Sequence, residues 1–388
     1  MHTPESSARV LVVSCLVAAF VAAGARSARA AEWVGGHGDN WSEPLNWLGT
    51  VPTSGQPVIL RLNATVPAYI FQDLTGGAVV SSVTSFRGNS SAPSFLIEGN
   101  PIDLSAGGDV TYVPGGGSST HTPVVFRAPV RLLGATTFSA AAQFSPAGNG
   151  NYANLFHNVT GSGSVTTSGH SSHIADSVIL SASYTGTTTV RSGMLRLGGA
   201  VGPFFAQTFH QANTTNQGDY LVMSGASLTG MGTIGLAPGR TVTVAGTTVP
   251  GSGGFLGLGE DGGVDLRING DLVLDDDGTY TANWLGRFSN LIVNGTADLR
   301  GVGDRLSTTG PLNFLTPGTY VVMEYQNRLG SFDILPMSHV ANVIYTSAEN
   351  SGPGQVLIQV PEPSFLTCTV AVLLLAARRR SPSSHARA

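Results

Sequence analysis

The chain has 388 residues, 51 glycines, only 11% charged residues and a formal net charge of −4, and its 19 basic residues are all arginines. Its two cysteines, Cys15 and Cys368, lie near the ends, so the central region can form no disulfide framework and no thiolate metal site. Residues 31–360 contain 12 Arg against 21 Asp plus Glu, a net charge of −9, which argues against binding to nucleic-acid phosphates.

The first 30 residues predict a secretory signal peptide. A short segment with one arginine precedes an apolar run at residues 10–25, and Ala28 and Ala30 frame an Ala-x-Ala cleavage site before Ala31. We therefore expect residues 1–30 to be removed on export.

Residues 31–60 contain Trp33, Trp41 and Trp47, three of the four tryptophans in the chain, among glycines and turn-forming Asn40 and Asn46. This segment resembles the N-terminal part of many exported β-helix proteins. We expect it to be a cap, because an uncapped terminal coil exposes apolar core and unpaired strand edges. The alternative is an exposed aromatic platform that stacks on sugars.

The body, residues 31–340, consists of short apolar-alternating runs separated by Gly or Asn turns. Examples are Thr241-Val-Thr-Val244 and Leu272-Val-Leu274. Valine and threonine runs between glycines predict strands, and the positive mean hydropathy argues against a disordered stalk. The sequence thus predicts an all-β body. A β-sandwich or several small all-β domains are the alternatives to a single solenoid.

Weak internal repetition favours the solenoid. Residues 184–199, Tyr-Thr-Gly-Thr-Thr-Thr-Val-Arg-Ser-Gly-Met-Leu-Arg-Leu-Gly-Gly, are the clearest unit, with looser echoes at 228–235 and 241–251. This unit resembles the autotransporter-associated β-strand repeat. The resemblance implies a right-handed parallel β-helix in which each coil must stack on its neighbours. At roughly 20 to 25 residues per coil, we expect about 13 to 15 coils.

Metal-binding and catalytic motifs are weak in this sequence. His170 and His173 would point to opposite faces of a strand. Asp271, Asp275, Asp276 and Asp277 are weak calcium candidates, because consecutive aspartates fit calcium-loop spacing poorly. We therefore predict no metal and no cofactor, and we interpret the aspartates as an ordinary turn.

Motifs of common hydrolases are also missing, since the chain has no Gly-x-Ser-x-Gly and no His-Glu-x-x-His. We predict no catalytic residues. Two alternatives remain: a polysaccharide lyase or glycoside hydrolase on a β-helix, and a carbohydrate-binding module. A groove with an arginine among three or more carboxylates would favour the enzyme.

Residues 341–360 are expected to form closing strands and a linker, and residues 361–388 form a tail. In the tail, Pro361-Glu362-Pro363 is followed by an apolar run at 365–377 and by Arg378-Arg379-Arg380. This order resembles the PEP-CTERM sorting tail of exported bacterial proteins. The resemblance implies a short transmembrane helix, transient inner-membrane anchoring and processing by an exosortase. This 13-residue run spans only about 20 Å as a helix, short of a bilayer core of about 30 Å.

The sequence therefore predicts an exported bacterial protein with a structural or adhesive role at the cell surface or in the extracellular matrix. Its expected partners are the secretion machinery and an exosortase, with an extracellular polysaccharide as a candidate ligand.

Overall fold

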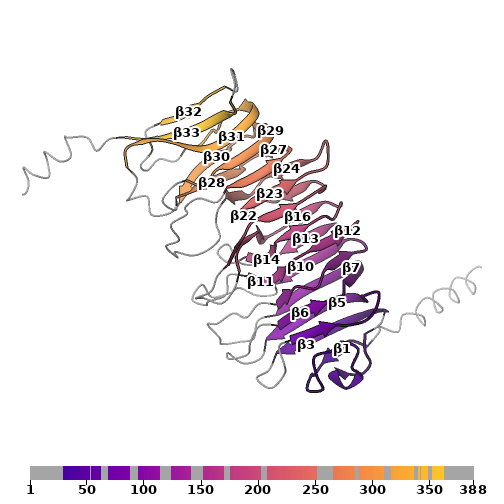
Figure 1. Cartoon of the computed structure of the whole chain (residues 1–388). Helices are drawn as coiled ribbons and strands as arrows, with labels where there is room; N and C mark the ends of the chain where they lie inside the picture. The colour runs from indigo at the N-terminus through magenta and orange to yellow at the C-terminus, as the bar shows by residue number, and fades with distance from the viewer. Residues whose placement is uncertain are drawn as a thin grey trace, which may run out of the picture.

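The computed structural model describes the chain from Arg29 to Pro361 with gaps. The described residues are 29–52, 54–62, 69–87, 95–113, 124–140, 152–169, 175–201, 208–250, 265–284, 288–309, 316–335, 340, 342–347 and 352–361. They are almost entirely β-structure and form a rod, with β1 and β33 at opposite ends (Figure 1). The rod is a β-solenoid, as the sequence predicted.

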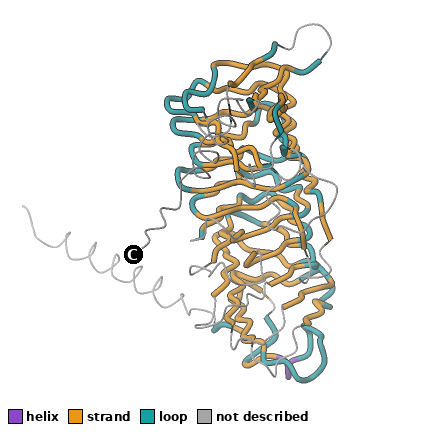
Figure 2. Tube along the Cα trace, turned by 90° about the vertical axis from the view of Figure 1, so that its left-hand side faces the viewer, coloured by secondary structure: helices purple, strands orange, loops and turns teal. Residues whose placement is uncertain are grey.

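Each coil contributes strands to three rows that run along the rod. Two rows belong to one bent 21-stranded sheet, and the third row is a separate 10-stranded sheet. Neighbouring strands within the third row are parallel, as in the pairing of β11 with β14 and of β14 with β17. Strands of successive coils lie one above another, with loops at the corners (Figure 2).

The strands of the three rows have the following bounds. The first row contains β9 (Val130–Leu132), β12 (Val159–Gly161), β15 (Ser181–Ala182), β20 (Ala212–Thr214), β23 (Gly232–Gly235) and β26 (Leu266–Asn269). The second row contains β10 (Thr136–Ala140), β13 (Val165–Ser168), β16 (Thr188–Val190), β21 (Tyr220–Val222), β24 (Thr241–Val244) and β27 (Asp271–Leu274). Five long strands run through both rows: β3 (Ser54–Leu62), β5 (Ala78–Arg87), β7 (Ile102–Val113), β29 (Leu291–Leu299) and β31 (Gly318–Gly330). The third row contains β4 (Tyr69–Gln72), β6 (Phe95–Gly99), β8 (Val124–Phe126), β11 (Tyr152–Phe156), β14 (Ala175–Ile179), β17 (Gly193–Leu197), β22 (Ala226–Gly230), β25 (Thr247–Pro250), β28 (Thr279–Asn283) and β30 (Arg305–Thr309).

The coils are fewer than the sequence predicted, and some of them are longer. Hydrogen-bonded partners in neighbouring coils lie 22 residues apart at Asp219 and Thr241 but 29 apart at Tyr69 and Glu98. With one strand per coil, the third row has ten strands. The expectation of 13 to 15 coils is therefore wrong, because connections of unequal length add residues that the repeat pattern does not contain.

Antiparallel strands close both ends of the rod. At the first end, β1 (Ala31–Trp33) pairs in parallel with β3 and antiparallel with β2 (Trp47–Leu48), which follows the 3₁₀ helix η1 (Pro44–Asn46). At the other end, β33 (Gly354–Val360) pairs antiparallel with β31 and with β32 (Asn342–Tyr345). A separate two-stranded antiparallel sheet is formed by β18 (Gly199–Val201) and β19 (Thr208–His210).

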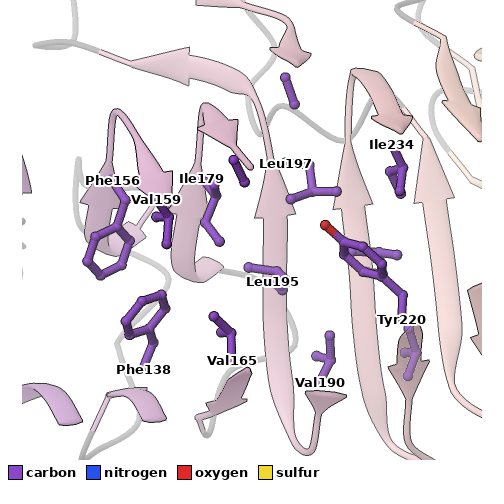
Figure 3. Close-up of a cluster of buried hydrophobic side chains, with 14 of the residues drawn as sticks. Phe138, Phe156, Val159, Val165, Ile179, Val190, Leu195, Leu197, Tyr220 and Ile234 are labelled. Carbon is purple, nitrogen blue, oxygen red and sulfur yellow. The ribbon is translucent and has the colours of Figure 1, made fainter. Parts of the chain in front are cut away.

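The core lies inside the three rows. Phe138 of the second row stacks on Phe156 of the third row at a ring-centroid distance of 4.2 Å, and Val159 of the first row is buried with them (Figure 3). Inward-facing apolar side chains recur at alternate positions, as period-2 strands require. Burial of this continuous column is what binds one coil to the next.

Glycines occupy one corner in successive coils, between the first and second rows. A Cβ atom at Gly163 would lie 2.0 Å from the carbonyl oxygen of Gly134, and one at Gly186 would lie 2.3 Å from that of Gly163. The backbones approach so closely that only glycine fits at this corner.

Candidate functional site

The predicted signal-cleavage site lies directly before the first strand. Ala31 is the first residue of β1 and is buried, and Ala30 precedes it as a half-buried residue. Ala28 lies outside the described residues. Cleavage before Ala31 would therefore release a chain that begins with the first strand of the solenoid.

The predicted sorting tail begins directly after the last strand. Val360 ends β33, and Pro361 follows it as an exposed residue. Glu362, Pro363, Arg378, Arg379 and Arg380 lie outside the described residues, as does the apolar run at 365–377. Within the part of the chain that the structure describes, no helix is long and apolar enough to cross a bilayer.

The three N-terminal tryptophans are buried, as the cap interpretation requires. The Trp33 and Trp41 rings each pack edge-on against Trp47, at centroid distances of 5.0 and 4.8 Å. The indole N–H of Trp47 donates to the carbonyl oxygen of Trp41 at 2.7 Å. The buried Asn46 amide donates to the carbonyl oxygens of Gly38 and Asn40 and so fixes the turn around them. An exposed tryptophan platform for sugar stacking is therefore not what these residues form.

The weak calcium candidates lie at the start of β27 and in the turn after it, where three of them accept hydrogen bonds from backbone N–H groups. A carboxylate oxygen of Asp271 accepts from the backbone N–H of Thr296 at 2.7 Å, and one of Asp276 accepts from that of Val302 at 2.9 Å. Asp275 accepts from the backbone of Asp276, and Asp277 has a φ of 63°. Among the described residues, no three His, Cys, Asp or Glu side chains are arranged to hold a metal ion. His170 and His173 lie outside the described residues.

The sequence analysis did not identify the buried carboxyl group of Asp304, which lies beside this turn. Asp304 is fully buried, and neither of its carboxyl oxygens has a hydrogen-bond partner among the described residues. The pKa of Asp304 is raised from 3.8 to about 7, chiefly by burial and also by the nearby carboxylates of Asp333, Asp276 and Asp275. The local sequence does not signal this site, because the coil winding brings residues 276, 304 and 333 together.

Arginines pair with carboxylates of neighbouring coils on the outside of the rod. Arg131 binds the buried Asp103, Arg61 binds Glu32 at 2.7 Å, and Arg127 binds Glu98 at 2.7 Å. Hydrogen bonds from the Tyr69 hydroxyl and from Arg127 lower the pKa of Glu98. Each of these arginines has one carboxylate as its partner, an arrangement that ties coils together.

The outer face of the second row carries hydroxyl groups in register. We call it the hydroxyl face and define it by half-buried threonines and serines on β5, β7, β10, β13, β16 and β24: Thr84, Thr111, Thr137, Ser139, Thr166, Ser168, Thr189 and Thr243. Thr137, Thr166 and Thr189 are direct register partners in three successive coils. Thr111 and Ser139 hydrogen-bond along the face at 3.0 Å between their hydroxyl oxygens.

The geometry of the hydroxyl face is set by the strands below it. Strands of successive coils are about 4.8 Å apart, so its hydroxyls repeat at that spacing along the rod. Asp109 joins the face on β7, and Leu221 on β21 interrupts it between Thr189 and Thr243. Thr137, Thr166 and Thr189 form an uncharged column on this face.

A scan against models of protein families gave no match, and a search of curated proteins gave none.

Proposed function

We propose that the protein is an exported bacterial component of the cell surface or extracellular matrix, with a structural or adhesive role. The observation that carries this proposal is the hydroxyl face, an array of register-matched hydroxyls along a rigid solenoid. Such a face offers many weak, equivalent contacts. It suits a repeating partner such as an extracellular polysaccharide.

Export and processing belong to the same proposal. Residues 1–30 act as the signal peptide, and residues 361–388 act as a PEP-CTERM-type tail with a short membrane helix that an exosortase processes. The position of both signals directly outside β1 and β33 supports this proposal. A precursor would be anchored in the inner membrane, and the released rod would reach the surface or medium.

The finer features of the fold are also proposed. The winding is right-handed, as in nearly all crossovers between parallel strands of one sheet. Residues 31–60 form the N-terminal cap, residues 31–340 the body and residues 341–360 the closing segment. We also propose that the protein has no catalytic residues, no cofactor and no nucleic-acid partner.

Fractionation of native cells, followed by mass spectrometry of the mature termini, tests the proposal. A chain that begins at Ala31, ends near Pro361 and lies in the outer layer or medium is the expected result. A chain that still ends at Ala388 in the inner membrane would overturn the processing step and leave a tethered periplasmic protein.

A further inference from the structure

A strip of polar and aromatic side chains runs along the outer face of the third row, in the first coils of the rod around β6 (Figure 1). Asn40 forms a parallel bridge with Phe71 of β4, and Phe71 is the register partner of Glu98 of β6. Arg127 and His157 occupy the same position in the next two coils, directly after β8 and β11. We call these five residues the Phe71 strip.

The charged groups of the Phe71 strip are held in place from two sides. The Tyr69 hydroxyl donates to one carboxylate oxygen of Glu98 at 2.8 Å, and Arg127 donates to the other at 2.7 Å. These bonds lower the pKa of Glu98, so its carboxylate stays an ionised acceptor at neutral pH. The Arg127 side chain is 55% exposed and that of Glu98 is 26% exposed. A carboxylate can accept more than two hydrogen bonds and a guanidinium can donate more than one, so the pair keeps capacity for a ligand.

An exposed aromatic ring lies beside this pair. Phe71 is 40% exposed, and its backbone is fixed by the N–H bond to Asp39 at 2.7 Å and by the bond from Trp41 at 2.8 Å. Asn40 adds an exposed amide in the preceding coil. A sugar unit has an apolar face of C–H groups and a rim of hydroxyl groups. An exposed ring flanked by oriented donors and acceptors is complementary to both.

The position of the strip on a sheet face argues against other polymers. The strands β4, β6 and β8 are already paired along the rod, so a peptide strand cannot add to them by backbone pairing. The excess of acidic residues in the body disfavours an anionic polymer. Five coils at a spacing of about 4.8 Å make the strip about 19 Å long, which is enough for several units of an extended sugar chain.

We propose that the Phe71 strip binds a neutral, extended polysaccharide. Phe71 stacks under the C–H face of one sugar unit, and the Glu98–Arg127 pair hydrogen-bonds the hydroxyl groups of a neighbouring unit. The strip lies on the third row, whereas the hydroxyl face lies on the second row, so either surface can bind without the other. Export and processing are not needed for this binding.

A tryptophan placed in the strip reports binding directly. All four native tryptophans are buried, so Phe71→Trp adds an exposed indole and keeps an aromatic ring at the site. Cellohexaose, xylohexaose and mannohexaose are titrated one at a time, into wild type by calorimetry and into Phe71→Trp by fluorescence. We expect at least one chain to bind and to shift the emission of the introduced indole to the blue. Wild type that binds none of the three would overturn the proposal, and so would binding that leaves this emission unchanged.

Truncation of the strip measures its share of the binding. For a chain that binds, Phe71→Ala and Glu98→Gln should each weaken binding roughly tenfold, because they remove the stacking ring and the ionised acceptor. Leu133→Ala, at another exposed apolar position, is the matched control and should bind as wild type does. Thermal denaturation checks that each variant is folded, and the emission of Phe71→Trp remains decisive if Phe71→Ala unfolds. Equal binding by folded Phe71→Ala and wild type would overturn the assignment.

Two further measurements distinguish the strip from other sites. A variant with Thr137→Val, Thr166→Val and Thr189→Val should bind these short chains as wild type does. Loss of their binding in that variant would place the sugar on the hydroxyl face instead. Oligogalacturonate, an acidic chain, should bind more weakly than the neutral chains, and tighter binding of it would overturn the assignment of a neutral ligand.

Discussion

The carboxylate of Asp219 accepts a hydrogen bond at 2.9 Å from the backbone N–H of Thr241, 22 residues later in the next coil. Its second oxygen accepts from Arg240 at 3.1 Å. Other aspartates accept backbone N–H groups across coils in the same way: Asp73, Asp265, Asp271, Asp276 and Asp333. Six aspartates of the body therefore help to hold the backbones of neighbouring coils together.

Replacing Asp219 should separate the backbone contact from the ion pair. Asp219→Ala leaves the Thr241 N–H without its acceptor and should lower the free energy of unfolding by about 1–2 kcal/mol. Arg240→Ala removes only an exposed ion pair and should cost at most about 1 kcal/mol. Urea denaturation measures both, and equal losses would show that the ion pair is the important contact.

Asp304 should make the protein less stable as pH rises through neutrality. Its pKa is about 7 in the folded state and 3.8 as the ordinary value, so the folded state binds the proton more tightly. This contribution to stability is complete below about pH 4 and is lost as the pH rises through about 7.

The free energy of unfolding, measured by urea at pH 5.5 and pH 8, should be higher at pH 5.5. Asp304→Asn should remove most of this difference, because an amide stays neutral. Glu98 and Asp298 have lowered pKa values in the folded state, so their contributions to stability are lost as the pH falls through those values. This change has the opposite sign to that of Asp304 and occurs at lower pH. If Asp304→Asn kept the wild-type difference in the free energy of unfolding between pH 5.5 and pH 8, Asp304 would not be its cause.

The cap should depend on the packing of its tryptophans. Trp41→Ala empties a fully buried site and should destabilise the protein by about 3–5 kcal/mol. Trp47→Phe keeps most of the ring but leaves the carbonyl oxygen of Trp41 without its donor, so the loss should be smaller. Wild-type fluorescence should be blue-shifted and resistant to aqueous quenchers, and a red-shifted, readily quenched emission would contradict burial.

The glycine corner should not tolerate a methyl group. Gly163→Ala forces a Cβ into the carbonyl oxygen of Gly134 and should destabilise the protein by about 1–3 kcal/mol. Gly352→Ala is the matched control, because no atom lies within 4 Å of its added Cβ. Thermal denaturation compares the two, and similar melting temperatures would mean that the coils can move apart without cost.

The hydroxyl face should lose binding in steps. Thr137→Val, Thr166→Val and Thr189→Val each keep the shape of the strand but remove a hydroxyl group. Single variants should bind a neutral polysaccharide slightly less than wild type, and the triple variant should bind at least several-fold less in a sedimentation assay. Thr281→Val on β28, away from this face, is the control. Loss of all binding in one single variant would instead indicate a localised site.

The sequence by itself predicted the all-β solenoid, the inward tryptophans and the strand–turn–strand unit at residues 184–199, where β16 and β17 form. These features are local, since side-chain alternation and glycine turns act over a few residues. Both processing signals stay predictions. The predicted signal peptide ends directly before β1, and the predicted sorting tail begins directly after β33.

Only the tertiary structure decided which distant residues meet. Coil length, the stacking of Thr137 on Thr166 and the burial of Asp304 beside Asp276 and Asp333 depend on the winding of the chain. Connections of unequal length shift the repeat from coil to coil, so no fixed interval in the sequence relates these residues. Burial of the shared core sets the register instead, and the register then determines which side chains share the outer faces.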